Sequence, residues 1–494
     1  MWSSLILELA MSTETVPLTS AVDSADHSTL DVKADVEMTP SASVEISRMF
    51  NLAWPVFLAY QLETLPGPIC VALVGHIQGN NTSVLVDAAY LSATMTNITA
   101  LAIGFGLASA MDTLCSQAFG AGKMDKLGVY LQSGVLVLGA CLLPVFYMSW
   151  EAESIMLFFG QDPEISKYAG EFSRVTVWGI PFLFVYELIK KLQQSQNIVL
   201  PMMYVAAIGV VVNLLTGYYF TYHTSWGFLG AAAGRVCGNI ALPLSIVIYF
   251  YFDHKTTSTW WNGFQWREAA DHVWLFLSLG IPSMMMLAVS WWAFCTLGFL
   301  AGLLPNNIEA VSVNAVLGQL LTLNFMIYLG ISVSSNVLIG NALGANQPLR
   351  AQLITRLALY GGYASAVFMG TIFMIFRHTI PIFFVSDAAT IENVANAMFV
   401  MIPLGVFDGL NGICEGIFKG MGRQTVAAVI NILSYYAFGL PMAYLVGFAW
   451  KYGLEGVWLG FSSGTTLCFF VFITMIHFTN WPELARLAQE RVQM

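Results

Sequence analysis

The chain has 494 residues, of which 57% are hydrophobic and only 10% are charged. Soluble proteins carry about 25% charged residues, so the composition excludes a soluble globular protein and indicates one embedded in a lipid bilayer. The net charge of −10 says little about partners, because about half of the acidic excess lies in the N-terminal tail, and we expect no nucleic-acid partner. The seven cysteines form no CxxC pair and have no histidine at ligand spacing, which predicts reduced thiols and neither a metal nor another cofactor.

Residues 1–45 are rich in Ser, Thr, Asp and Glu and poor in aromatic residues, which is typical of a disordered tail. The apolar start lacks a basic region and a cleavage site, so we expect no signal peptide. Translation starting at Met11 would give an equally reasonable N-terminus.

Apolar runs long enough to cross a bilayer follow, each requiring about 20 residues. Before residue 253 they cover approximately 49–76, 88–118, 127–149, 165–190, 202–222 and 229–252. After residue 272 they cover approximately 273–303, 310–341, 352–376, 393–418, 426–450 and 456–478. The sequence therefore predicts twelve membrane spans, six on each side of a polar linker.

The second half repeats the first. The segment 106–121 aligns with 330–345, and the glycine rows at 230, 234, 238 and at 456, 460, 464 align at an offset of 226. Such rows are typical of closely packed helices. Because six spans return the chain to the same side, the two copies have the same orientation, and an axis along the membrane normal relates them. The predicted fold is an all-α polytopic membrane protein with two six-helix lobes.

Lysine and arginine gather at one set of span ends, which by the positive-inside rule places both termini and the linker in the cytosol. The expected domains are a tail (1–45), an N-lobe (46–252), a cytosolic linker (253–272), a C-lobe (273–479) and a short polar cytosolic tail (480–494).

Span ten carries two acids within the membrane. Asp408, Asn411 and Glu415 share one helix face, and Pro403 and four glycines are expected to make this helix easy to bend. Ionisable groups at mid-membrane are expensive and mark ion pathways. Desolvation favours the neutral carboxyl, so we interpret this face as a proton-coupling site. The alternative is a pair of permanently protonated acids bonded to neighbouring helices.

Three further acids lie in or near spans. Glu63 precedes Pro66 and Pro68, so it either binds a ligand beside a helix break or bonds the freed backbone groups. Glu187 is spaced to pair with Lys191, with the lysines extending to the membrane surface. For Glu187 and Asp112 we favour structural or gating roles.

The runs 104-GFGLASAMDTLCSQAFGAG-122, 161-QDPEISKYA-169, 196-QNIVLP-201, 302-GLLPN-306 and 431-NILSYYAFGLP-441 together resemble the multidrug and toxic compound extrusion (MATE) family, especially its eukaryotic branch. The resemblance covers about residues 46–480. It implies two lobes around a central cavity that faces alternate sides, and export of organic cations or amphipathic compounds in exchange for protons or sodium.

The resemblance carries over residue by residue. Phe407-Asp408 matches an acidic position of the family in span ten, and Glu309 matches a glutamate at the start of span eight if one gap is allowed. Relatives commonly read Glu-Trp-Trp-x-Phe-Glu in span seven, whereas this chain has Ser290 and Cys295 in place of both glutamates. Our hypothesis is that Glu63, which aligns with Ser290, and Glu415 partly replace that charge.

The remaining candidates are residues expected to line the cavity. By the resemblance, Cys70 aligns with an aspartate in span one of the bacterial branch of the family. The aromatic residues offer ring faces that could stack on a cation, although packing or anchoring at the membrane interface would explain them as well. The set is Gln61, Cys70, Ser290, Trp291, Trp292, Cys295, Tyr435 and Tyr436.

The sequence predicts a non-enzymatic, multi-pass antiporter that exports organic cations or amphipathic xenobiotics or metabolites, driven by protons or by sodium. We expect a monomer in the plasma membrane rather than the vacuolar membrane. Alternatives with the same fold are an exporter of organic anions or neutral metabolites and, ranked lower, a flippase for lipid-linked substrates. The scattered histidines argue against a membrane enzyme.

Overall fold

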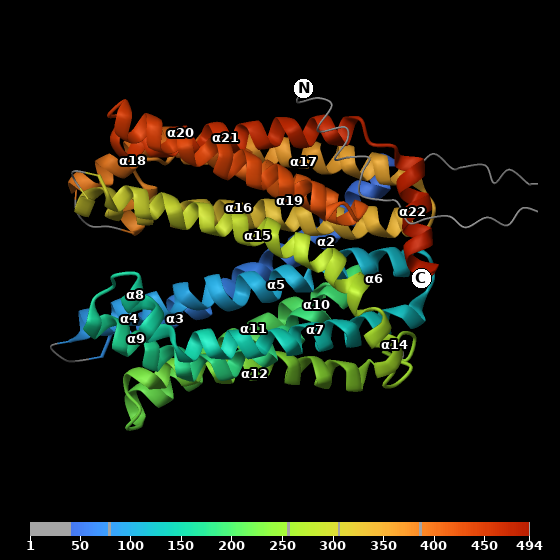
Figure 1. The fold of residues 1–494 in the computed structure, drawn as a ribbon, viewed down its shortest axis with the longest axis horizontal. Helices are drawn as coiled ribbons and strands as arrows, with labels where there is room; N and C mark the ends of the chain where they lie inside the picture. Colours follow the sequence, from blue (N-terminus) through green and yellow to red (C-terminus); the bar gives the residue numbers. More distant parts are fainter. Residues whose placement is uncertain (1–40, 78–80, 254–256, 305–306, 385–387, 494) are drawn as a thin grey trace, which may run out of the picture. The chain divides into compact units, whose positions relative to one another are not determined.

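The structure is a computed structural model that describes residues 41–77, 81–253, 257–304, 307–384 and 388–493. Residues 41–494 form one compact unit, shown as a ribbon in Figure 1. Within the described residues, twelve helical segments are long and apolar enough to cross a membrane. The predicted number of spans and the all-helical fold class are confirmed.

The spans of the first half combine several helices where the chain kinks. In order they are α2 (Ala42–Thr64) with α3 (Pro66–Gly75); α4 (Thr82–Thr96) with the π-helix η1 (Asn97–Leu101), α5 (Ala102–Ala108) and α6 (Ala110–Gly120); α7 (Met124–Trp150); α9 (Pro163–Thr176) with η2 (Val177–Gly179) and α10 (Ile180–Ser195); α11 (Leu200–His223); and α12 (Phe228–Phe252).

The second half follows the same plan. Its spans are α15 (Val273–Gly302), α16 (Asn307–Gly344), α17 (Pro348–Ile375), α18 (Ala388–Met421), α19 (Gln424–Ile432) with η4 (Leu433–Gly439), α20 (Leu440–Tyr444) and η5 (Leu445–Ala449), and α21 (Gly453–His477). Shorter elements are α8 (Ala152–Phe158), α14 (Trp266–Asp271), η3 (Ile380–Phe383) and α22 (Trp481–Gln493). We call the span ends that the charge rule assigns to the cytosol the inner ends, and the opposite ends the outer ends.

The first span breaks at Leu65, between α2 and α3. Pro66 and Pro68 cannot donate backbone hydrogen bonds, so the turn before them loses partners. The Thr64 hydroxyl donates to the carbonyl of Gln61 at 2.8 Å and compensates for one of these losses. The break predicted from the two prolines is therefore present, and a neighbouring side chain stabilises it.

The two halves make reciprocal contacts at their inner ends. A Cβ added at Gly120 would meet the carbonyl of Asn341, and one added at Gly344 would meet the carbonyl of Gln117. Gly344 and Asn341 are the repeat counterparts of Gly120 and Gln117 at an offset of 224. An exchange of partners of this kind is the signature of a two-fold axis. The predicted pseudo-symmetry is therefore visible in individual contacts.

Backbone conformation repeats in the same way. Left-handed residues occur in pairs at the ends of equivalent helices: Gly122 (φ 72°) with Asn346 (φ 54°), Asn197 (63°) with Gly422 (73°), and Gly227 (49°) with Gly453 (63°). A residue at positive φ satisfies the carbonyls at a helix C-terminus or allows a tight turn, and Gly and Asn tolerate it best.

The first helix of each half crosses into the core of the other half at the inner end. Met49, Leu52 and Val56 of α2 pack in the cluster formed mainly by the second half. Phe276 and Leu279 of α15 pack in the cluster formed mainly by the first half. Farther out, the apolar cluster around Cys70 of α3 contains only first-half residues among those described. The halves are thus joined by apolar packing at their inner ends.

The last residues form a helix where the sequence predicted only a short polar tail. The buried face of α22 includes Trp481, Leu484, Ala485 and Ala488, a helical repeat of apolar residues. In the linker, Trp260 is buried and packs edge-on against Phe250 of α12.

The glycine rows act as close-packing surfaces, as predicted. A Cβ at Gly234 of α12 would collide with the backbone of Gly217 of α11. We expect Gly234→Val to lower the free energy of unfolding by about 1–3 kcal/mol, because overpacking forces the helices apart. Thermal unfolding in detergent measures this loss. Gly139→Val in α7 is the matched control, since Gly139 is exposed and its Cβ would meet nothing within 4 Å, and equal melting temperatures for the two variants would contradict the prediction.

Candidate functional site

The acids of the second half lie on α18, which is continuous from Ala388 to Met421. Its glycines face α16 rather than leaving space beside the acids. A Cβ at Gly409 would enter the ring of Tyr328, and one at Gly412 would lie 2.8 Å from the ring of Phe325. The flexibility expected from these glycines is therefore replaced by tight packing of α18 on α16, which fixes the position of the acids.

Asp408 is half-buried and makes no hydrogen bond or ion pair with any residue that the structure describes. It lies close enough to Tyr328 of α16 and Tyr435 of η4 to interact electrostatically with both. Its carboxyl group is also an electrostatic neighbour of Glu415. A carboxyl group with no protein partner remains available to a proton or to a ligand.

The other two polar residues of this face are held by neighbouring helices. The Asn411 amide donates to the carbonyl of Thr465 in α21 at 2.9 Å. Glu415 accepts a hydrogen bond of 2.7 Å from the amide of Asn431 in α19. The oxygen of that amide accepts a longer contact of 3.4 Å from the thiol of Cys468. Asn411 and Glu415 are therefore each fixed by a hydrogen bond to a neighbouring helix.

The two tyrosines of span eleven lie in the π-helix η4, which sequence reasoning missed. π-helical turns occur frequently at functional sites because they displace side chains from the regular helical positions. Tyr435 is buried beside Phe461, with ring centroids 5.6 Å apart. The hydroxyl of Tyr436 donates to the carbonyl of Val289 in α15 at 3.2 Å and thereby links spans seven and eleven.

The acids of the first half form a network with two buried lysines. Glu63 accepts hydrogen bonds from the Tyr186 hydroxyl at 2.5 Å and from the Lys190 ammonium at 2.8 Å. Lys190 also pairs with Glu187 at 2.6 Å, and its side chain is 0% exposed. The same ammonium lies 4.2 Å from the ring centroid of Tyr60, within the range of a cation–π contact.

Lys191 completes the network. It pairs with Asp112 at 3.0 Å, whereas its distance to Glu187 is 4.0 Å. The predicted pairing of Glu187 with Lys191 is present at this distance, but the lysines were also expected to extend to the membrane surface. Both lysines are instead buried in the bundle, because the carboxylates of α2, α6 and α10 compensate their charge. Three carboxylates (Glu63, Glu187 and Asp112) face two ammonium groups, which leaves one net negative charge.

Next to this network, hydrogen bonds from α6 to the second half join the two halves. The Thr113 hydroxyl donates to the carbonyl of Lys419 at 2.6 Å and accepts a hydrogen bond of 2.5 Å from Gln424. Gln117 donates to the carbonyl of Gly420 at 3.1 Å. The Lys419 ammonium has electrostatic neighbours in both halves, Asp112 and Glu415 among them. A chain of charges thus runs from the first-half network to the second-half acids.

Other predicted residues lie apart from these two clusters. The hydroxyl of Ser290 donates to the carbonyl of Met286 in its own helix, and Cys295 is exposed. Trp291 packs against the first-half core, and Trp292 is 43% exposed. Cys70 is buried and its thiol contacts the carbonyl of Ala231 at 3.4 Å, and Gln61 is half-buried. The side chain of Glu309 lies outside the described residues.

Sequence reasoning missed the partners that position the acids, namely Tyr186, Lys190, Asn431, Thr113 and Lys419. The signal for Lys190 was its place near Glu187 inside an apolar run, since a lysine there needs compensation. Across the described residues, no group of three or more His, Cys, Asp or Glu side chains is arranged to hold a metal ion.

The MatE family model matches residues 55–219 and again residues 282–445, once in each half. Mouse multidrug and toxin extrusion protein 2 is 31% identical over 455 residues, which cover 92% of this chain and 78% of the relative. Protein DETOXIFICATION 16 of Arabidopsis thaliana is 29% identical over 458 residues, 92% of each chain.

Solved structures show the same fold. The eukaryotic MATE transporter AtDTX14 superposes with a TM-score of 0.86 at 24% identity, over 91% of this chain and 99% of that chain. A multidrug resistance MATE family transporter in an outward-facing conformation superposes with a TM-score of 0.76 at 17% identity, over 92% of this chain and 100% of that chain.

Proposed function

Because this chain belongs to the MATE family of multi-pass transporters, we propose that it exports organic cations or amphipathic compounds in exchange for protons. Members of the family are driven by ion gradients and are not enzymes. The curated relatives are named for multidrug and toxin extrusion, which supports a xenobiotic or toxic metabolite as the substrate. The observation that carries the proposal is the carboxyl group of Asp408, half-buried and without a partner among the described residues.

Asp408 can exchange its ligand because nothing in the described structure holds it. A proton and a cationic substrate compete for one carboxylate, so binding of either displaces the other. Glu415 is an electrostatic neighbour of Asp408 and raises the free energy of two simultaneous negative charges. The pair therefore favours a state in which one proton or one cation is bound, which is the requirement for exchange.

The charge chain through Lys419 offers a route from proton binding to movement of the halves. Lys419 interacts with Asp112 across the inner interface and with Glu415 within its own helix. A change of protonation at Glu415 changes the charge that Lys419 balances within its own helix, and therefore its interaction with Asp112 across the inner interface. Through this link, proton exchange at Glu415 changes how firmly the hydrogen bonds of Thr113 and Gln117 hold the inner end closed.

The inner end is closed by packing and by hydrogen bonds, so we propose that this conformation releases substrate to the outside. There the first helix of each half packs into the core of the other half, through Leu52 of α2 and Leu279 of α15.

A second candidate is export of neutral or anionic metabolites by the same route. It is favoured by α15, which contains no acidic residue and carries Ser290 and Cys295 where relatives have glutamates. Fewer fixed negative charges in the cavity weaken the preference for cations.

The test uses purified protein in liposomes and a permanently charged quaternary ammonium compound, which cannot be trapped as a weak base. An acidic lumen is expected to drive its accumulation, and a sodium gradient alone is not. Protein-free liposomes are the control. Accumulation driven only by sodium would replace the proton in the mechanism. No accumulation under either gradient, with accumulation of an organic anion, would favour the second candidate.

A further inference from the structure

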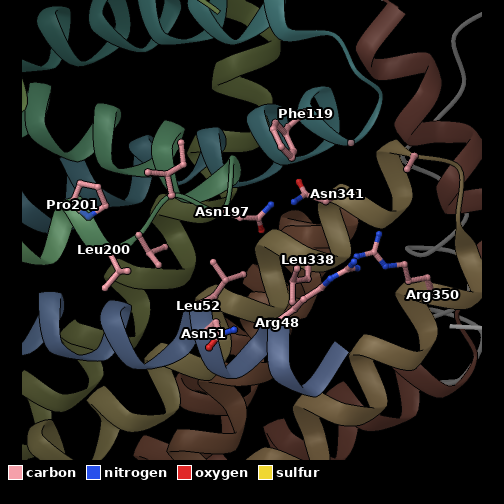
Figure 2. Close-up of a pocket in the computed structure, with 14 residues that line it drawn as sticks. Arg48, Asn51, Leu52, Phe119, Asn197, Leu200, Pro201, Leu338, Asn341 and Arg350 are labelled. Atoms are coloured by element: carbon pink, nitrogen blue, oxygen red, sulfur yellow. The ribbon is translucent and has the colours of Figure 1, made fainter. Parts of the chain in front are cut away.

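A pocket of about 810 Å³ lies at the inner end of the bundle. Its walls come from α2, the end of α6, the turn between α10 and α11, α16 and the first turn of α17. Figure 2 shows Arg48 and Arg350 converging on one side, while Asn197 and Asn341 point toward each other on another. The pocket lies apart from Asp408 and Glu415, neither of which lines it.

The pocket carries an excess of positive charge. Arg48 and Arg350 share the carboxylate of Glu45, at 2.8 Å and 2.9 Å. Two guanidinium groups against one carboxylate leave one net positive charge. Arg48 uses one nitrogen in this pair and its side chain is 51% exposed, so further donors remain for a ligand. Guanidinium groups bind phosphate with a favourable geometry.

A buried amide in the pocket lacks a partner. Asn341 is 7% exposed, and its side-chain oxygen accepts no hydrogen bond in the structure. A buried amide oxygen without a hydrogen-bond partner is unfavourable. Because the amide oxygen and nitrogen can be interchanged, Asn341 can donate to an anion or accept from a hydroxyl group. The helix α11 also begins at the pocket wall with Leu200, and a helix N-terminus favours an anion.

The site that the pseudo-two-fold axis relates to this pocket is filled by another part of the chain. Its occupant indicates which groups are absent from the open pocket. Gln117, the counterpart of Asn341, accepts a hydrogen bond of 2.6 Å from Arg491 of α22. The Arg491 guanidinium also lies beside Gly422, the counterpart of Asn197. Gln489 of α22 donates to the carbonyl of Gly344. At that site the occupant is the helix α22 of the same chain, and its Arg491 supplies the guanidinium group.

In the open pocket the guanidinium groups belong to the wall. At the filled site, the residue equivalent to Arg48 is Leu275, at an offset of 227. The residue equivalent to Arg350 is Lys126, at an offset of 224. The expected occupant is therefore an anion rather than a cation. Leu52, Val199 and Leu200 provide an apolar wall beside the charged groups, and Leu200 is 43% exposed.

We propose that this pocket binds the phosphate group of an anionic phospholipid from the cytosolic leaflet, with its acyl chains along the apolar wall. Basic pockets between membrane helices on the cytosolic side bind lipid headgroups of this class. Arg48 lies on α2 in the first half and Arg350 lies on α17 in the second half. The bound lipid bridges the halves and stabilises the conformation with a closed inner end.

The test measures thermal unfolding of the protein in phosphatidylcholine nanodiscs, with and without phosphatidylserine. Phosphatidylserine is expected to raise the melting temperature of the wild type, whereas inorganic phosphate in phosphatidylcholine alone is not. Arg48→Gln and Arg350→Gln are expected to lose this increase. Arg486→Gln is the matched control, since Arg486 lies on α22, outside the pocket, and it is expected to keep the increase.

A further variant separates lipid binding from folding. Asn341→Leu removes the unpartnered amide, so we expect its basal melting temperature to be equal or higher and its response to phosphatidylserine to be smaller. An equal increase with inorganic phosphate would overturn the lipid as the occupant. An unchanged lipid response in both arginine variants, or an equal loss in Arg486→Gln, would overturn the site.

Discussion

The Asp408→Asn variant is expected to lose gradient-driven accumulation of substrate and to keep its fold. Asparagine has nearly the shape of aspartate but cannot take up and release a proton. Because Asp408 makes no hydrogen bond or ion pair with the described residues, the substitution leaves no partner without a bond. One pH unit is equivalent to about 1.4 kcal/mol, which sustains a roughly tenfold accumulation in a one-to-one exchange. We expect the variant to reach equal concentrations on both sides.

The measurement is accumulation in acid-lumen liposomes over a range of external pH. The wild-type rate is expected to change with pH, and the Asp408→Asn rate is expected to be independent of it. Glu455→Gln, which neutralises an exposed acid in the first turn of α21, is the matched control and is expected to behave as the wild type. Uphill accumulation by Asp408→Asn would place the coupling group elsewhere, and Glu415→Gln would then be measured next.

The Lys190→Met variant is expected to lose about 3–5 kcal/mol of stability. Breaking a buried ion pair by removing one partner leaves the other charge without compensation. Lys190 compensates both Glu63 and Glu187, at 2.8 Å and 2.6 Å, and is 0% exposed. Thermal unfolding and denaturant titration in detergent measure the loss. Lys123→Met is the control, because Lys123 is exposed at the inner end of α7.

A double variant tests whether the pair acts as a unit. Glu63→Gln removes one of the two negative charges that Lys190→Met would leave uncompensated, while its amide oxygen can still accept a hydrogen bond from Tyr186. Residues in one ion-pair network show interaction energies of about 0.5–3 kcal/mol. We therefore expect the double variant to be less destabilised than the sum of the single variants. Strict additivity, or a change within 0.5 kcal/mol for Lys190→Met, would contradict a structural role for this pair.

The membrane fold followed from the sequence because its signals are long and repetitive. Each span is an apolar run, and the repeat was visible in the alignment of residues 106–121 with 330–345. The two matches to the family model begin at Pro55 and at Pro282, one in each half. The glycine rows also indicated their role correctly, since α11 packs on α12 and α20 on α21 at Gly234 and Gly460.

The candidate site was less accessible to sequence reasoning, because its partners come from distant spans. Glu63 meets Lys190 across 127 positions of the chain, and Thr113 meets Lys419 across 306. Spacing within one helix indicates which residues share a face but not which helix that face meets. The glycines of α18 illustrate this limit, since the same pattern fits a flexible helix and one packed tightly on α16. The apolar repeat of α22 was readable from Trp481 to Val492, but its polar composition obscured it.

The reciprocal contacts of Gly120 with Asn341 and of Gly344 with Gln117 bear on how far the two sides of the crossing can differ. Two identical chains of half this length could make the same crossing, and its two sides would then be identical. In a single chain each side has its own sequence. Arg491 of α22 fills one side, while the pocket on the other side is open. The single chain thereby keeps a permanent difference between two faces that a symmetric pair of half-length chains would have to keep equal.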